Sequence, residues 1–239
     1  MGNLRFGFHP VREMLRHRPQ DVAEVRSSAQ DGKRRREIEG LCGSRGISLR
    51  FVSAAELDAL AGGGTHNGFC ALLEVATGVP SGSTGATRDP DLLLLLEDVQ
   101  DPRNLGAILR VAEGAGVGRV MIRDRGSAPI SPAAVKTSAG AAEWIDVERI
   151  VNPSQTIERL RADGFWIYGA AAEGEAPWSL DLTGKVVLCL GGEENGLRRR
   201  TRESCDALVG LPMRGRVDSL NVATAAAALL YDAVRQRLL

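Results

Sequence analysis

The chain has 239 residues, of which 44% are apolar and 25% are charged, and its formal net charge is zero. Wholesale disorder is excluded, because a disordered chain carries too few apolar residues to build a core. A membrane span is excluded as well, since no apolar run approaches the ~20 residues that cross a bilayer. The amino terminus has no apolar stretch of signal-peptide length, so we expect a cytoplasmic protein without membrane contact.

The four cysteines and three histidines do not form a metal-binding pattern. The cysteines stand at positions 42, 70, 189 and 205 with no Cys-x-x-Cys pair, and no histidine lies at ligand spacing from any of them. We therefore expect no metal site and no disulfide framework, but reduced cysteines that mostly pack as small apolar residues.

Positive charge is unevenly distributed along the chain. Residues 1–53 contain eleven Lys and Arg against six Asp and Glu, a local excess of five positive charges, and a second basic cluster occupies Arg198–Arg202. Binding of a polyanion depends on local charge, so a net charge of zero does not exclude RNA as a partner. Either cluster alone is more typical of a solvated helix face, whereas the two together with the motifs described below favour RNA.

Residues 1–75 alternate helical and strand patterns and predict a small α/β domain with a basic surface. The last predicted helix follows Ser53, a suitable N-cap residue. The predicted helices are His9–Arg18, Lys33–Arg45 and Ala54–Leu60, and the predicted strands are Ile47–Val52 and Gly68–Val75.

A stretch rich in Gly, Ser, Thr and Pro follows over residues 76–91. It has neither a helical nor an alternating apolar period, and this pattern predicts a flexible linker. A coil of ~15 residues spans roughly 20 Å, which is enough for the first domain to move relative to the second.

Residues 92–239 show the same alternation more strongly and predict a larger domain. Leu92–Leu96 is a continuous aliphatic run, as expected of a strand buried on both faces. The helix after it carries apolar residues at i, i+3, i+4 and i+7, counted from Leu105. Strand–helix alternation of this kind predicts an α/β fold with a mostly parallel sheet covered on both faces. Further strands are predicted at Arg119–Ile122, Glu143–Val147, Phe165–Gly169 and Val186–Leu190, and a closing helix from Val222.

The glycines at 114, 116 and 118 resemble part of a dinucleotide-binding motif, but their context excludes it. A Rossmann fingerprint lies between a strand and the helix that follows, whereas these glycines follow a helix and precede a strand. We expect them to end the helix and turn the chain.

Three polar segments follow predicted strands of the second domain, where α/β proteins place ligand sites. The first, Glu97–Gly106, holds Asn104, and its helix carries Arg110. Taken alone, Asn104 is as typical of a helix cap and Arg110 of a surface arginine. On an ideal helix, the six-residue spacing leaves the two side chains about 120° apart.

The second and third segments combine glycines with polar side chains. Gly191–Leu197 holds Glu193 in a glycine-rich turn that allows a backbone to approach a ligand closely. Leu211–Val222 presents Ser219 and Asn221 at the start of the closing helix, where Ser219 also suits the N-cap.

In this order within one α/β domain, the three segments resemble the signature motifs of the SpoU/TrmH branch of the SPOUT RNA methyltransferases. The resemblance covers Leu92 to the carboxyl terminus. It extends to the first domain, where Gly7–Leu15 and Thr65–Gly68 are similar to a ribosomal-protein-like RNA-binding domain fused to many members. This two-domain arrangement is most similar to the bacterial members that methylate the 2′-hydroxyl of a guanosine in large-subunit rRNA.

The resemblance implies properties that periodicity does not. The implied fold is the SPOUT fold, a parallel sheet with a carboxyl-terminal trefoil knot, in a homodimer that binds S-adenosyl-L-methionine close to the dimer interface. The implied cofactor contacts are Gly191, Leu211, Met213 and Leu220. The implied catalytic set is Asn104, Arg110, Glu193, Ser219 and Asn221.

The implied reaction transfers a sulfonium methyl group to a ribose 2′-hydroxyl of RNA, with rRNA favoured over tRNA. Family proposals make the arginine of the first motif the base, but a guanidinium with a pKa above ~12 is a poor base at neutral pH. We expect Arg110 to hold the target phosphate and stabilise the alkoxide while Ser219, Glu193 or a water relays the proton. Asn104 would orient Arg110 or Glu193.

Several alternatives stay open. A tRNA ribose methyltransferase or an antibiotic-resistance rRNA methyltransferase of the same fold would carry the same motifs. A noncatalytic RNA-binding ribosome-assembly factor would keep the fold without the reaction, although the complete catalytic set argues against it. A hydrolase built on Glu193 and Glu194 is the least favoured, since adjacent residues in a turn seldom aim at the two sides of one bond.

Overall fold

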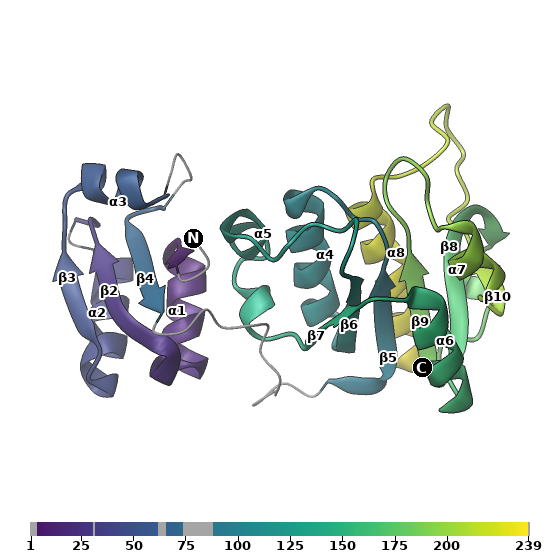
Figure 1. The fold of residues 1–239 in the computed structure, drawn as a ribbon, viewed down its shortest axis with the longest axis horizontal. Coiled ribbons are helices and arrows are strands. Elements are labelled where there is room, and N and C mark those ends of the chain that lie inside the picture. The colour runs from purple at the N-terminus through teal and green to yellow at the C-terminus, as the bar shows by residue number, and fades with distance from the viewer. Residues whose placement is uncertain (1–3, 31, 62–65, 74–87, 239) are drawn as a thin grey trace.

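The computed structural model describes residues 4–30, 32–61, 66–73 and 88–238, which form two units with separate sheets (Figure 1). The amino-terminal unit has a four-stranded sheet in the order β1-β4-β2-β3. The carboxyl-terminal unit has a six-stranded sheet in the order β10-β8-β9-β5-β6-β7. Each unit buries its own cluster of apolar side chains.

The amino-terminal sheet is mixed. Strand β4 pairs antiparallel with β1 and β2, and β3 pairs parallel with β2. The strands are β1 (Leu4–Phe6), β2 (Val22–Ser27), β3 (Ser48–Phe51) and β4 (Phe69–Leu73). The helical elements are α1 (Phe8–His17), the 3₁₀ turn η1 (Pro19–Asp21), α2 (Lys33–Arg45) and α3 (Ala54–Ala61).

Both faces of the amino-terminal sheet are covered by helices. Helices α1 and α2 pack on one face, where Met14 and Phe69 are buried, and α3 packs on the other, where Leu57 and Cys70 are buried. Phe69 and Cys70 are neighbours on β4, and successive side chains of a strand point to opposite faces. The short strand β4 therefore supplies both cores.

The six-stranded sheet is parallel throughout. The carboxyl ends of its strands share one edge, so the loops that follow them gather there. The strands are β5 (Asp89–Leu96), β6 (Val117–Arg123), β7 (Val147–Ile150), β8 (Trp166–Glu175), β9 (Val186–Leu190) and β10 (Ala207–Val209). The helical elements are α4 (Pro102–Gly114), α5 (Pro132–Thr137), η2 (Ala141–Glu143), α6 (Pro153–Ala162), η3 (Pro177–Ser179), α7 (Arg199–Glu203) and α8 (Val222–Arg237).

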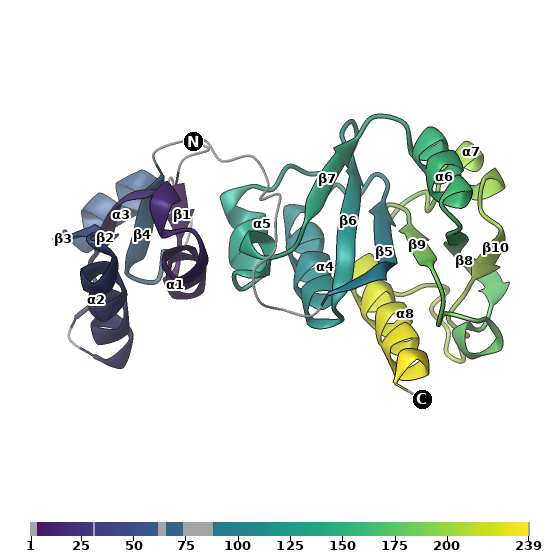
Figure 2. The same cartoon turned by 90° about the horizontal axis from the view of Figure 1, so that it is seen from below.

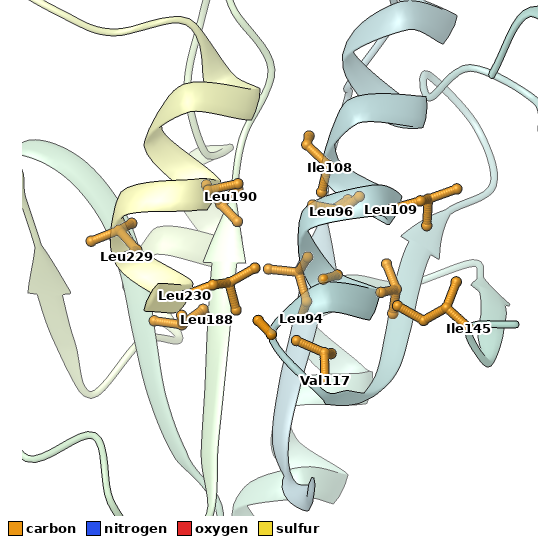
Figure 3. Close-up of a cluster of buried hydrophobic side chains, with 14 of the residues drawn as sticks. Leu94, Leu96, Ile108, Leu109, Val117, Ile145, Leu188, Leu190, Leu229 and Leu230 are labelled. Carbon is orange, nitrogen blue, oxygen red and sulfur yellow. The ribbon is translucent and has the colours of Figure 1, made fainter. Parts of the chain in front are cut away.

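The main core lies between the central strands and the helices α4 and α8 (Figure 3). Leu94 and Leu96 of β5 point into it and meet Ile108 of α4 and Leu230 of α8 (Figure 3). The alternate leucines of β5 pack on the opposite face, in a cluster that includes Ile157 of α6. Burial on both faces explains the unbroken run of leucines Leu92–Leu96 in β5.

The predicted parallel sheet with helices on both faces is confirmed. Helix α4 ends at Gly114, and Gly116 has a φ of 73°, so these glycines end a helix as predicted. The strand predicted at Glu143–Val147 is wrong. Ala141–Glu143 instead forms a 3₁₀ turn whose side chains are buried, and β7 begins only at Val147.

The predicted linker extends too far at its carboxyl end. Residues 74–87 lie outside the described residues, but β5 begins at Asp89, whose register partner is Val117 of β6. Residues 89–91 are therefore strand and not linker. Pro90 is tolerated because the β5–β6 register shifts between Asp89 and Leu93, so the missing N–H interrupts no regular ladder.

The two units contact each other through β1 and α1 on one side and α5 and η2 on the other (Figures 1 and 2). Arg5 and Glu143 are both buried at this contact, and Arg5 Nε donates to Glu143 Oε1 at 2.6 Å. The rings of His17 and Trp144 also meet across it. In this structure a buried ion pair helps to hold the amino-terminal unit against the carboxyl-terminal unit.

No helix in the described ranges is long and apolar enough to cross a bilayer. The same ranges contain no group of three or more His, Cys, Asp or Glu that could hold a metal ion. All four cysteines are free thiols; Cys42, Cys70 and Cys189 are buried and Cys205 is half-buried.

Candidate active site

The helices α4 and α8 are not capped by Asn104 and Ser219, the residues that the sequence offered as caps. Asp101 caps α4 through its side chain, so Asn104 on the first turn is not the cap. Asn221, and not Ser219, caps α8, because its Oδ1 accepts the backbone N–H of Ala223 at 2.9 Å. The amide of Asn104 and the Nδ2 of Asn221 are therefore available to other side chains.

Asn104, Glu193 and Asn221 form a chain of hydrogen bonds that joins the three polar segments. Asn104 Nδ2 donates to Glu193 Oε1 at 2.5 Å, and Asn221 Nδ2 donates to Asn104 Oδ1 at 3.1 Å. Asn221 is itself fixed as the cap of α8. A carboxylate held in this way by an anchored amide is oriented to accept a proton from a hydroxyl brought beside it.

A cavity of about 320 Å³ adjoins this chain of hydrogen bonds. Apolar side chains and glycine backbone form most of its wall, with the Glu193 carboxylate and the Ser219 hydroxyl among its few polar groups. Such a lining suits a nucleoside-sized ligand. Of the residues predicted from the sequence, the cavity is lined by Gly191, Glu193, Leu211, Met213, Ser219 and Leu220.

Gly191 allows the tight turn at the cavity. A Cβ at this position would lie 1.9 Å from the carbonyl carbon of Gly196, so no side chain fits. The turn is closed by the Gly196 N–H, which donates to the Gly192 carbonyl at 3.0 Å, and Gly196 has a left-handed φ of 60°. Any side chain at position 191 would part the two backbones and displace Glu193.

Arg110 is not brought to this cluster within one chain. It lies on the exposed side of α4, and the described residues give its guanidinium neither a hydrogen bond nor an ion pair. The helical geometry already indicates this, because six residues turn Arg110 about 120° away from Asn104. Its charge is available to a group from outside the chain.

Part of the cavity wall was not predicted from the sequence. Ala170–Ala172 of β8 and Gly210 after β10 line it, and a Cβ on Gly210 would lie 2.6 Å from the carbonyl oxygen of Ala171. The signal that could have found this wall is the run of small residues Gly169–Ala172, which directly follows the apolar start of a strand.

Comparison with known families identifies the chain. A family model described as SpoU rRNA Methylase matches residues 91–231, which include Asn104, Glu193 and Asn221. The chain belongs to the SpoU rRNA methylase family. A second model, described as RNA 2′-O ribose methyltransferase substrate binding, matches residues 5–77.

Relatives of this SpoU family member match it over nearly its whole length. It is 42% identical, over 97% of the chain and 96% of the relative, to the 23S rRNA (guanosine-2′-O-)-methyltransferase RlmB of Xanthomonas axonopodis pv. citri (strain 306). It is 37% identical to the enzyme of the same name from Haemophilus influenzae, over 100% of the chain and 99% of the relative.

Solved structures agree in fold. The SpoU methyltransferase AviRb from Streptomyces viridochromogenes, in complex with AdoMet, superposes with a TM-score of 0.79 at 25% identity, covering 98% of this chain and 90% of that one. A crystal structure described as an RNA 2′-O ribose methyltransferase gives a TM-score of 0.80 at 25% identity, covering 99% and 89%.

Proposed function

We propose that this protein transfers the methyl group of S-adenosyl-L-methionine to the ribose 2′-hydroxyl of a guanosine in 23S rRNA. The observation that carries the proposal is the hydrogen-bonded chain of Asn221, Asn104 and Glu193 beside a nucleoside-sized cavity. The 42% identity to a methyltransferase named for that nucleoside, over nearly the full length of both chains, favours rRNA over tRNA.

The cavity lining fits S-adenosyl-L-methionine. Gly191, Leu211, Met213 and Leu220 would hold it, because they contribute apolar side chains and glycine backbone to the lining. A Cβ on Gly191 would collide with the backbone of Gly196, so glycine at this position preserves the tight turn that forms part of the lining. When bound, the cofactor supplies an electrophilic methyl group.

The side chains of the chain itself align the target hydroxyl and remove its proton. Glu193 accepts the proton, directly or through Ser219 or a water, because its carboxylate is exposed and held by Asn104. Asn221 fixes Asn104 in turn. Arg110, exposed and without an ion pair among the described residues, binds the phosphate of the target nucleotide and stabilises the developing alkoxide.

Residues 1–75 form, in this proposal, an RNA-binding domain joined by a linker to a catalytic domain over 92–239. Its support is a basic surface beside β3. Lys33, Arg34, Arg36 and Arg50 are exposed, and the described residues give them no ion pair. Phe51 is 50% exposed and lies under the guanidinium of Arg35, with 4.1 Å from Cζ to the ring centre. An exposed ring of this kind offers a surface on which an unpaired base stacks.

The carboxyl-terminal unit offers a second set of phosphate-binding arginines, which we call the arginine edge. These side chains are exposed, have no ion pair within the described ranges and follow the carboxyl ends of four strands: Arg103, Arg125, Arg200, Arg214 and Arg216. Arg119 at the opposite edge, by contrast, pairs with Asp146 and Glu148. Unneutralised charge on the side that holds Glu193 suits an RNA backbone.

We further propose that the protein is a cytoplasmic homodimer with a trefoil knot at its carboxyl terminus. The support for the dimer is a pair of exposed residues one turn apart on α8, Ala228 and the 52% exposed Tyr231, together with the exposed Leu220 of the cavity. The support for the knot is that the chain leaves the edge strand β10 and returns to the sheet centre as α8, packed against α4. Sedimentation equilibrium tests the dimer.

The deciding experiment maps ribose methylation in RNA incubated with the protein and labelled S-adenosyl-L-methionine. Methylation of one guanosine in 23S rRNA supports the proposal, and methylation of tRNA alone replaces it with the alternative. Titration calorimetry with the cofactor addresses the noncatalytic alternative, because an RNA-binding assembly factor without the reaction has no need to bind it.

A further inference from the structure

Glu97, the residue that directly follows β5, touches both ends of the loop that carries Glu193. Its backbone N–H donates to the carbonyl of Leu190, where β9 ends, at 2.9 Å. Its carboxylate accepts the backbone N–H of Arg198 at 3.0 Å and the hydroxyl of Thr201 at 3.1 Å, where α7 begins. The loop of residues 191–197 is thus held by Glu97 at both ends, through the Glu97 backbone at its start and the Glu97 carboxylate at its finish.

The Glu97 side chain is buried, at 2% exposure, and this burial has a structural reason. Helix α7 receives no side-chain cap from its own N-cap residue, Arg198. Glu97, which directly follows β5 and lies 101 positions earlier in the chain, supplies the missing acceptor. A buried carboxylate persists only where donors satisfy it, and here both donors lie at the start of α7, directly after the loop.

Asp98, the next residue along the chain, also contacts both ends of this loop. Its backbone has a left-handed φ of 57°, rare for a residue with a side chain. Its carbonyl lies so close to Gly192 that a Cβ there would be 2.3 Å from the oxygen. Its carboxylate accepts from Arg123 and from Arg198, each at 2.6 Å.

We infer that Glu97 is a positioning residue for the methyl transfer, acting through Glu193. Asn104 lies on the segment that continues from Glu97, and Glu193 lies on the loop that Glu97 holds at both ends. Glu97 therefore fixes the position of the segment that carries Asn104 relative to the loop that carries Glu193. The inference rests on the proposed function, and it adds a residue that contacts neither the cavity nor, in this structure, the three-residue chain of hydrogen bonds.

The test uses Thr201→Val, which removes one donor to Glu97 at constant volume, and Thr201→Ser, which keeps the hydroxyl. We expect the single-turnover rate of methyl transfer at saturating RNA and cofactor to fall about tenfold in Thr201→Val and to stay within about twofold in Thr201→Ser. The matched control is Tyr168→Phe, which deletes a buried hydroxyl that donates to Asp181 away from the loop. It should lower the melting temperature without changing the rate.

Two readouts separate positioning from mere stabilisation. In a Glu193→Gln background, Thr201→Val should cause no further loss of rate, whereas an equal loss in both backgrounds would overturn the inference. Hydrogen exchange of the peptide over residues 191–197 should speed up in Thr201→Val but not in Tyr168→Phe. Unchanged exchange also overturns the inference. This measurement needs no activity, so failure of the proposed function and failure of the role of Glu97 give different results. Glu97→Ala, if it folds, should show the same pattern with a larger loss.

Discussion

Arg5 and Glu143 lie 138 positions apart in the chain and form a buried ion pair between the two units. Their side chains are 10% and 2% exposed, and Arg18 Nη1 lies 4.0 Å from the second oxygen of Glu143. Because each unit has its own core, this pair contributes to how the units are held together and not to the fold of either one.

We expect Glu143→Gln to separate the units without unfolding them. Breaking a buried pair from one side costs ~3–5 kcal/mol, and separation lets Arg5 regain water. Small-angle scattering should report a larger radius of gyration, while calorimetry still shows cooperative melting. Glu37→Gln, which breaks the exposed pair with Arg16, is the control and should change neither. Unaltered scattering from Glu143→Gln would mean that other contacts hold the units.

Asn104→Asp should lower the single-turnover rate about 100-fold. The substitution replaces a donor to Glu193 with a second carboxylate, so the two acids repel each other and Glu193 moves from its position. The cap of α4 is untouched, because Asp101 supplies it. Asp101→Asn preserves that cap and serves as the control. Rates for Asn104→Asp within a few-fold of the parent would show that the Asn104–Glu193 bond is not used in the reaction.

The sequence predicted the elements whose signals are local. The unbroken leucines of β5 and the glycines after α4 needed no knowledge of the rest of the chain. The wrong strand at Glu143–Val147 shows the limit of such signals. Glu143 is buried because Arg5, from the other unit, neutralises it, and no local pattern contains that partner.

The residues of the candidate site could be named from the sequence, but the hydrogen bonds between them could not. Motif order placed Asn104, Glu193 and Asn221 in one region, and the structure joins them by hydrogen bonds. Because Asp101 caps α4, the side-chain amide of Asn104 is available to Glu193. The choice of capping residue depends on backbone angles, which the sequence does not give. Arg110 carries the positive charge of the set, yet the helical rotation per residue turns it away from Asn104.

Phe51→Ala should weaken RNA binding about tenfold at fixed salt. Stacking of a base on an aromatic ring contributes ~1–3 kcal/mol, and Arg35 keeps its ion pair with Glu39 when the ring is removed. Affinity can be measured by filter binding with an rRNA fragment. Trp166→Ala removes an equally exposed ring from the amino end of β8, away from the arginine edge, and should leave affinity unchanged. Equal effects of the two substitutions would contradict a specific stacking surface.

Thiol reactivity should follow the environments of the four cysteines. Burial raises the pKa of Cys42 to about 11 and that of Cys70 to about 12, so both stay protonated at pH 8. A hydrogen bond from Cys189 lowers the pKa of Cys205, which is also half-buried rather than fully enclosed. A lower pKa means more thiolate at a given pH, so iodoacetamide should modify Cys205 first, as peptide mass mapping over time would show. Early labelling of Cys42 or Cys70 would contradict this order.

The role of Arg110 can be settled by the pH dependence of Arg110→Lys. If Arg110 grips a phosphate through two N–H groups, lysine offers only a point charge, and the single-turnover rate should fall about 100-fold at every pH. If Arg110 were the base, lysine would serve better, because its ordinary pKa of about 10.4 lies closer to the working pH. The variant would then gain rate steeply as pH rises and overtake the parent in alkali.

The matched control for Arg110→Lys is Arg119→Lys, at the amino edge of the sheet, where Asp146 and Glu148 hold the cation and no RNA contact is proposed. Its rate and pH profile should equal those of the parent. A profile of Arg110→Lys that is parallel to the parent but displaced downward assigns Arg110 to substrate binding and leaves Glu193 as the proton acceptor. A near-normal rate at neutral pH would exclude the two-point grip on the phosphate, since one ammonium cannot reproduce it.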